Sequence, residues 1–482
     1  MPLGLIGTME VAKRGLEANR QGIELTGHNL SNVSNPAYAR QRLRIQTADA
    51  LPSPTGPVGT GSKVTGIEQV RDRLLDTEIV SETSVSGYLE ARKKALEFAE
   101  INLGQLLDRQ ASTPEGATAS LGVGGQFGLI EGLSDFFNAW QALSTSPNST
   151  ADRQVVVLRA ESLTEKFNSV NRRLDSLRSD LNVRVQDDVN LANQLLADIS
   201  DLSTSITSSE IGEIGNANDL RDRRQEKLEA LSKLVDVTYS EDTITNQLTL
   251  SIGGANVIST DSVVDTLQTL ANLSTGVERT QVQTAGGAAV TLTKGSIKGT
   301  IDARDSEIKT LSDDIDTLAG QLITQVNTVH AAGIALDGVS TGQSFFSSSS
   351  SNASNIALNS VLRADPSRIQ ASSTGDPGDN GVALTLAKMA NQPQAALGNL
   401  TFAERYNQSV ANLGQALSNT NTQTQDQDAV NRLLQRQRDS LGGVSIDEEM
   451  ANLVVFQRAF QASARMITTL DELLQSVINL TR

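Results

Sequence analysis

The chain has 482 residues, of which 38% are hydrophobic and only 3% are aromatic. So few aromatic residues disfavour one large core and favour long, thin domains, about three of them for a chain of this length. A net charge of −16 argues against a nucleic-acid or anionic membrane surface, and the absence of cysteine excludes disulfides, thiolate metal sites and cysteine nucleophiles.

The N-terminal residues 3–33 predict one amphipathic helix that ends near the turn at 34–36, because Pro36 disfavours helical backbone at the residue before it. Residues 42–46 alternate like a short strand, and the Pro- and Gly-rich segment 47–70 predicts a hinge or hairpin linker. Within the helix, apolar residues recur every seven positions, at Met9, Leu16, Ile23 and Leu30, with Leu5, Ala12, Asn19 and Thr26 between them.

The middle of the chain predicts long helices around a β insert. Helical periodicity covers 71–108, 131–146, 151–208, 217–234 and 301–332. Glycines at 116–128 interrupt it, and we expect a flexible linker there. Residues 236–300 alternate in short runs rich in Val, Thr and Gly, which predicts a small all-β outer domain. The Ser-rich segment 336–381 predicts an irregular, exposed region associated with that domain.

A second seven-residue (heptad) repeat marks the C-terminal helix. It places Ile446, Leu453, Phe460, Ile467 and Leu474 on one stripe, interleaved with Met450, Phe456, Ala464 and Leu470. Ser445 and Glu448 have the spacing of a capping box at its start, and the carboxylates of 447–449 suit the positive end of the helix dipole. Helix dipole and capping therefore explain this acidic run without a catalytic role.

The expected fold is mainly α with a smaller all-β domain, in an elongated multi-domain chain. The N- and C-terminal helices pair as a coiled-coil-like terminal domain, made of 1–46 with 440–482. A long-helix rod comprises 71–235, 301–335 and 382–439, and the β region 236–300 faces outward.

No motif of the chain predicts catalysis, a cofactor or a metal. His28 and His330 are the only histidines, and neither has a ligand at useful spacing. The glycines at 122, 124, 125 and 128 lack the spacing and the Lys of a phosphate-binding loop. The DPGDNG turn at 376–381 lacks the alternating acids and closing Glu of a calcium loop. We therefore predict a non-enzymatic protein.

Apolar stripes at helical spacing are usually core, yet two details favour an interface for both terminal stripes. They lie at the chain ends, which are normally disordered unless tied down. Polar residues such as Asn19, Thr26 and Gln457 also weaken each stripe as an isolated coiled coil. The predicted assembly interface comprises Leu5, Met9, Leu16, Ile23, Leu30, Ile446, Met450, Leu453, Phe456, Phe460, Ile467 and Leu474.

The segment GHNLSNVSNPAYARQR at 27–42 resembles the signature shared by axial proteins of the bacterial flagellum, the rod, hook and hook-associated proteins. Ala37 stands where many members have Gly, which indicates a turn without positive φ. The segments 133–154, 218–237, 318–338 and 443–480 are similar to the hook-associated members, above all those that stand first at the hook–filament junction. The characteristic positions of the signature are Asn29, Leu30, Asn32, Asn35, Pro36 and Tyr38.

The resemblance implies a structural subunit between hook and filament that assembles through its terminal helices. Its partners would be copies of itself, hook protein, the second hook-associated junction protein and an export chaperone at the C-terminal helices. The resemblance also implies type III export without cleavage. Consistent with this, 1–15 lacks the basic start and apolar run of a general secretory signal.

Three alternatives stay open at the level of the sequence. The second junction protein or another axial subunit, such as a flagellin-like one, would use the same terminal helices. A hydrolase fused to an axial scaffold would need an acid/base pair in the outer region, and 236–300 holds none that is recognisable. A coiled-coil adhesin would carry a general export signal, which is missing.

Overall fold

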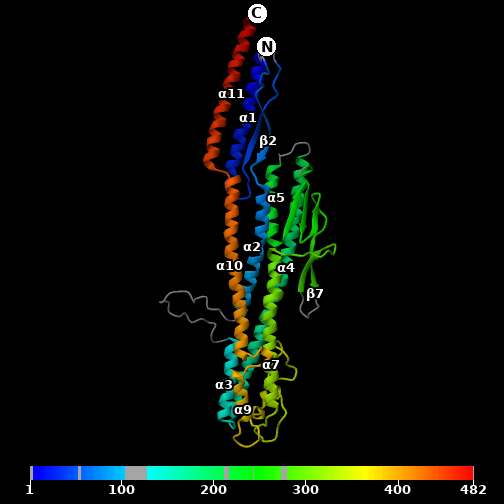
Figure 1. The fold of residues 1–482 in the computed structure, drawn as a ribbon, viewed down its shortest axis with the longest axis vertical. Coiled ribbons are helices and arrows are strands. Elements are labelled where there is room, and N and C mark those ends of the chain that lie inside the picture. The colour runs from blue at the N-terminus through cyan, green and yellow to red at the C-terminus, as the bar shows by residue number, and fades with distance from the viewer. Residues whose placement is uncertain are drawn as a thin grey trace, which may run out of the picture.

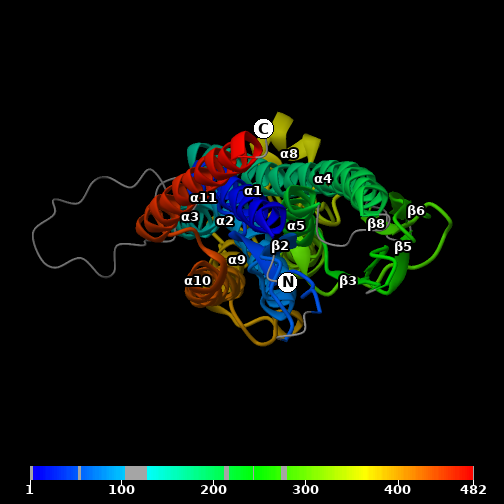
Figure 2. The same ribbon diagram turned by 90° about the horizontal axis from the view of Figure 1, so that it is seen from above.

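The chain leaves from one end of an elongated molecule and returns to the same end (Figure 1). This computed structural model describes residues 4–52, 56–103, 128–210, 217–242, 244–272 and 279–480. Long helices run along the molecule, and short strands gather on one side of it (Figures 1 and 2). The prediction of an elongated, mainly α chain with a smaller β region is confirmed.

The two terminal helices, α1 (Leu5–Ser31) and α11 (Ile446–Leu480), lie side by side in both views, which confirms the predicted pairing of the chain ends. The hairpin of β1 (Gln41–Thr47) and β2 (Ser62–Gln69) follows α1 and is antiparallel, with Gln41 opposite Gln69 and Thr47 opposite Ser62. Most of 47–70, predicted as a hinge or hairpin, is therefore the turn and return strand of a hairpin.

The rod is built from helices whose starts are capped as their sequences indicate. Asp72 accepts a hydrogen bond from Leu74 N at 2.9 Å, Ser149 accepts one from Asp152 N at 3.1 Å, and Thr401 forms a capping box with Glu404. The rod helices are α2 (Arg73–Asn102), α3 (Leu129–Thr145), α4 (Thr150–Ser209), α5 (Asn218–Leu234), α6 (Gly295–Asp302), α7 (Lys309–Ala331), α8 (Ser360–Ala364), α9 (Gly381–Lys388) and α10 (Phe402–Gly442). Shorter turns of helix are η1 (Ala303–Ile308), η2 (Pro366–Arg368), η3 (Met389–Asn391) and η4 (Ala395–Leu397).

The far end of the rod holds the main hydrophobic core. Trp140 and Phe136 of α3 pack with Phe345 and Phe346, all four without solvent exposure. The same core includes Ile356, Leu362 and Ile369. The prediction that 336–381 is an exposed part of the outer β domain is therefore wrong. Many of its serines lie at the surface, although Ser350 and Ser372 are buried, while Phe345, Phe346 and the other buried apolar residues close the end of the rod.

The β region lies against α4 and α5. Strands β3 (Val237–Glu241), β4 (Leu248–Ile252), β5 (Ala255–Ser259) and β6 (Ser262–Val263) form one antiparallel sheet in chain order, and β7 (Leu267–Asn272) pairs with β8 (Arg279–Thr284). Leu248, Leu250 and Ile252 point inward on alternate positions of β4 and form a second core with the rod. The last residues of the predicted β range 236–300 instead begin α6 at Gly295.

None of the helices in the described ranges is long and apolar enough to cross a membrane. The expected linker at 116–128 falls outside the described residues as far as 127, including the glycines at 122, 124 and 125. Gly128 is the N-cap of α3.

Candidate functional site

The contact between α1 and α11 is made by small residues of α1. A Cβ atom added at Gly22 would lie 2.6 Å from the Phe456 ring, and one at Gly15 would lie 3.3 Å from Ser463 Oγ. Ala12 and Ala18 are buried on the same helix. The predicted stripe of Met9, Leu16, Ile23 and Leu30 is only partly buried, whereas Ala12 and Thr26 of the interleaved positions are buried. The close contacts of this seam between α1 and α11 thus include Gly15 and Gly22, which do not belong to the seven-residue repeat.

The apolar face of α11 is wider than α1 can cover. Ile446 and Met450 are exposed, the former by 53%, while the remaining predicted interface residues are partly buried. Val455 and Ile478 are exposed by 62% and 60%, and Val454, Met466, Leu473 and Val477 are exposed as well. Exposed apolar residues in such number along one helix leave an apolar surface that no described part of the chain covers.

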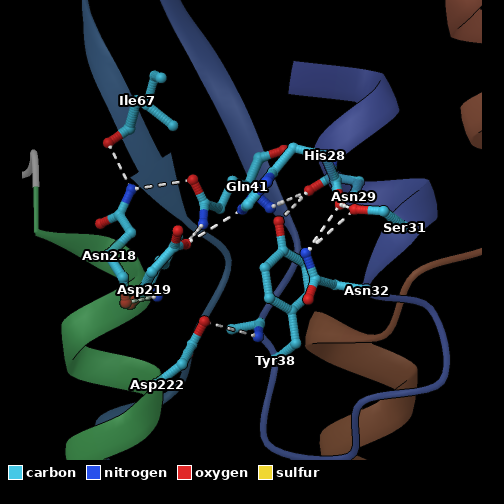
Figure 3. Close-up of polar contacts among 12 residues, drawn as sticks. His28, Asn29, Ser31, Asn32, Tyr38, Gln41, Ile67, Asn218, Asp219 and Asp222 are labelled. Atoms are coloured by element: carbon cyan, nitrogen blue, oxygen red, sulfur yellow. Dashed lines mark hydrogen bonds and ion pairs between the residues drawn. The ribbon is translucent and has the colours of Figure 1, made fainter. Parts of the chain in front are cut away.

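Asn29 is the centre of a polar network below this helix pair (Figure 3). The Tyr38 hydroxyl donates to Asn29 Oδ1 at 2.7 Å, and Gln41 N donates to the same oxygen at 3.1 Å. Asn29 Nδ2 donates to Gln41 O at 2.8 Å and to Glu449 Oε2 at 3.1 Å. One buried amide thus joins α1, β1 and α11, which only a side chain with both donors and acceptors can do.

The other signature residues shape the turn after α1. Asn32 Nδ2 donates to His28 O at 3.0 Å, and Asn35 Oδ1 accepts from Ala37 N at 3.1 Å, which forms an Asx turn. Pro36 O accepts from Arg438 Nη2 of α10 at 3.2 Å, and Leu30 is partly buried. Ala37 is not among the residues with positive φ, as its replacement of Gly indicates.

Arg40 binds the start of α11. Its guanidinium lies 2.7 Å from Glu448 and 2.8 Å from Glu449, whose side chain is only 2% exposed. Arg40 N also donates to Gly442 O at 2.8 Å, at the end of α10. The carboxylates interpreted as helix capping thus bind an arginine about 400 positions away in the chain. A charged pair at that separation leaves no local signal in a sequence.

Gly442 is required by close packing at the joint, the place where the chain after α1 meets the end of α10 and the start of α11. A Cβ atom there would lie 2.5 Å from Val70 O, so any other residue would push the hairpin from the end of α10. The glycine pair at 442–443 ends α10 and separates it from α11.

Two carboxylates of α5 tie the joint to the rod (Figure 3). Asp219 accepts from Gln41 Nε2 at 2.8 Å and lies 3.2 Å from His28 Nε2, so His28 has an acidic partner that its own helix does not supply. Asp222 accepts from Ala39 N at 3.4 Å and pairs with Arg71 at 3.3 Å. Burial raises the pKa of Asp222 to about 7, although Arg71 acts in the opposite direction.

The remaining titratable candidates are structural. His330 is fully buried, its Nδ1 lies 2.7 Å from Gln343 O, and its Nε2 accepts from Gln370 N at 3.0 Å. Burial lowers the pKa of His330 to about 4, so the ring is neutral at pH 7. Asp379 of the 376–381 turn accepts from Ser373 N and Thr374 N of its own loop. Across the described ranges, no three His, Cys, Asp or Glu side chains gather closely enough to hold a metal.

Comparisons with known proteins relate the chain to flagellar proteins. A family model described as flagellar hook-associated protein FlgK helical domain matches residues 119–346, and one described as flagellar basal body rod FlgEFG protein C-terminal matches residues 441–480. The chain is 27% identical to flagellar hook-associated protein 1 of Bacillus subtilis, over 98% of this chain and 97% of that one. It is 22% identical to the protein of the same name in Escherichia coli, over 97% and 98%.

A solved structure shares the fold. The flagellar hook junction protein FlgK from Burkholderia pseudomallei superposes with a TM-score of 0.62 at 14% sequence identity. The match covers 76% of this chain and 100% of that one. The signature joint and the paired chain ends therefore lie in a chain whose relatives are structural flagellar proteins.

Proposed function

This chain belongs to the family of flagellar hook-associated protein 1, and from that premise we propose that it is a structural subunit joining the hook to the flagellar filament through its terminal helices. The observation that carries this function is the uncovered apolar face of α11. Each large apolar side chain that becomes buried contributes about 1.5–3 kcal/mol, so packing of neighbouring subunits against this face drives assembly.

The interface consists of the stripes on both terminal helices. Partly buried residues of α1, such as Met9, Leu16 and Ile23, line one side of the pair, and Ile446 and Met450 extend the apolar surface on α11. Neither stripe is fully buried within one subunit. The full set is Leu5, Met9, Leu16, Ile23, Leu30, Ile446, Met450, Leu453, Phe456, Phe460, Ile467 and Leu474.

The Asn29 network sets the direction in which the terminal pair leaves the rod. A subunit that connects two different assemblies must present its terminal helices at a defined angle, and several buried hydrogen bonds specify an orientation better than apolar contact does. The family signature is thus a positioning device, while the α11 face supplies the association energy.

The partners follow from this position in the flagellum. Copies of the chain form a layer, hook protein contacts one side of it, and the second hook-associated protein contacts the other. A cytoplasmic chaperone covers the C-terminal helices before export, and the chain leaves the cell through the flagellar type III apparatus without cleavage. The exposed face of α11 supports such a chaperone, because uncovered apolar surface promotes aggregation.

The test replaces exposed residues of α11 without touching the α1 contact. In the triple variant Met450→Ser, Val455→Ser, Leu473→Ser, we expect an unchanged thermal midpoint and helix content but loss of incorporation at the hook–filament junction, followed in cells by electron microscopy. The control is Ile244→Ser in the β region, which is at least as exposed. Normal incorporation of a stably expressed triple variant contradicts the proposed interface.

A further inference from the structure

A second feature, apart from the α11 face, is a pocket of about 600 Å³ where the hairpin meets the rod and the β region. Its walls are the hairpin of β1 and β2, the first turn of α2, the α5 helix and β3. No residue of α11 or α1 lines it. Pockets of this volume commonly hold small ligands or a few side chains of a partner.

The hairpin changes its register at the wall of this pocket. Arg44 pairs with Gly66 and Ile45 with Val64, so Thr65 is the extra residue of a β-bulge. The Thr65 hydroxyl donates to Arg44 O at 3.0 Å. Bulges re-aim side chains, and here both Arg44 and Thr65 line the pocket.

The inner part of the pocket is electrically balanced. Arg221 and Arg224 lie 2.5 Å and 3.1 Å from Glu241, and Arg221 also pairs with Glu210 behind the wall. Arg71 lies 2.8 Å from Asp76. These arginines have carboxylate partners inside the fold and are not free to bind another anion.

Two arginines at the opening are not balanced in this way. Arg73 is 71% exposed, and its one carboxylate neighbour, Glu241, is 4.0 Å away and already bound by Arg221 and Arg224. Arg44 is exposed and forms no ion pair with another described residue. They come from two walls, the hairpin and α2, in a chain whose net charge is −16.

We propose that this pocket binds a pair of carboxylates, one at Arg44 and one at Arg73. A guanidinium recognises a carboxylate through two parallel hydrogen bonds. Two guanidiniums on separate walls therefore match a dicarboxylate or two acidic side chains. A pair of carboxylates brings one charge to each guanidinium, whereas a phosphate dianion concentrates both charges on one group. A bound pair bridges the hairpin to α2 and so stiffens the joint below the terminal helices.

The carboxylates have two possible sources, a free polycarboxylate or an acidic segment of a neighbouring protein. The first measurement titrates citrate into the full chain by calorimetry at constant ionic strength, with acetate as the single-carboxylate probe. We expect citrate to bind and acetate to bind more weakly, and the double variant Arg44→Gln, Arg73→Gln to weaken citrate binding about tenfold or more. The matched control is Arg432→Gln, Arg436→Gln, which removes two exposed arginines from α10.

A second measurement separates the two sources. If the double variant also incorporates poorly at the junction while the control incorporates normally, the carboxylates come from an acidic protein segment. If incorporation is unchanged and only citrate binding is lost, the site takes a free polycarboxylate. The proposal is overturned if citrate does not bind, if acetate binds equally well, or if the control variant loses as much citrate binding as the double variant.

Discussion

The far end of the rod and the terminal helix pair are both helical, yet one is complete within the chain and the other is not. At the far end, Phe136, Trp140, Phe345 and Phe346 pack in T-shaped and tilted pairs with ring centroids 5.1 to 6.3 Å apart and no exposed surface. At the terminal pair, Gly15 and Gly22 let α11 approach closely, while apolar residues of α11 stay in solvent. A core that is fully buried within the chain stabilises the subunit. A helix pair that leaves apolar residues in solvent provides a surface for assembly.

The largest effect should come from the rod. Trp140→Ala should lower the free energy of unfolding by about 3–5 kcal/mol, because it leaves a cavity in a closed core. Thermal or urea denaturation measures the loss, and Phe98→Ala, on an exposed residue of α2, serves as the control. An equal loss in both variants would show that the far end of the rod is not the complete core described above.

The joint between the two regions should respond to pH. The pKa of Asp222 is raised from 3.8 to about 7, so the folded chain holds this proton more tightly than the unfolded chain does. Its contribution to stability is therefore fully present below the ordinary pKa of 3.8 and is lost as the pH rises through about 7. Denaturation at pH 5 and pH 8 should show a smaller difference in Asp222→Asn than in the wild type. A pH profile that is unchanged in Asp222→Asn would exclude this group as the cause.

The terminal seam can be tested with two glycines of α1. Gly22→Ala places a Cβ atom against Phe456, whereas Gly27→Ala meets nothing within 4 Å. Alanine favours the helix equally at both sites, so we expect the first variant to be about 1–3 kcal/mol less stable in the terminal pair than the second. Hydrogen exchange of α1 and α11 measures this, and rod amides should be unaffected. Equal protection in the two variants would place the seam elsewhere.

The smallest effect concerns a single hydroxyl. Tyr38→Phe removes the donor to Asn29 and should cost about 1 kcal/mol. Tyr406→Phe is the matched control, because the buried Tyr406 hydroxyl has no hydrogen-bond partner among the described residues. The control should leave stability unchanged or slightly raise it. A larger loss of unfolding free energy in Tyr406→Phe than in Tyr38→Phe would show that the Asn29 network does not stabilise the joint.

Much of the local structure follows from periodicity and caps. The predicted helix 151–208 is Thr150–Ser209, and the predicted helix 217–234 is Asn218–Leu234. The error at 336–381 has a clear cause, since its serine-rich composition resembles an exposed loop. Its placement depends on a few buried residues such as Phe345 and Phe346, which pack against α3 some 200 positions earlier.

The candidate site was only half predictable. The signature positions around Asn29 and Tyr38 stand out in the sequence. Their distant partners do not, since Asn29 binds Glu449, and Asp219 binds the neighbouring His28 and Gln41. A seven-residue repeat also shows that a helix has an apolar stripe, but it does not show which side of that helix contacts the other helix. Gly22 lies one position from Ile23, and only packing decides that the glycine faces Phe456.

Local sequence patterns predict the helical rod, the β insert, an amphipathic helix at each chain end and the family signature, because each depends on residues within a few turns of one another. Tertiary structure alone decided the glycine seam, the joint that Arg40 and Asn29 form with α11, and the extent of α11 left uncovered. These depend on contacts between residues hundreds of positions apart, where the choice among similar surfaces is made by close packing and by buried hydrogen bonds.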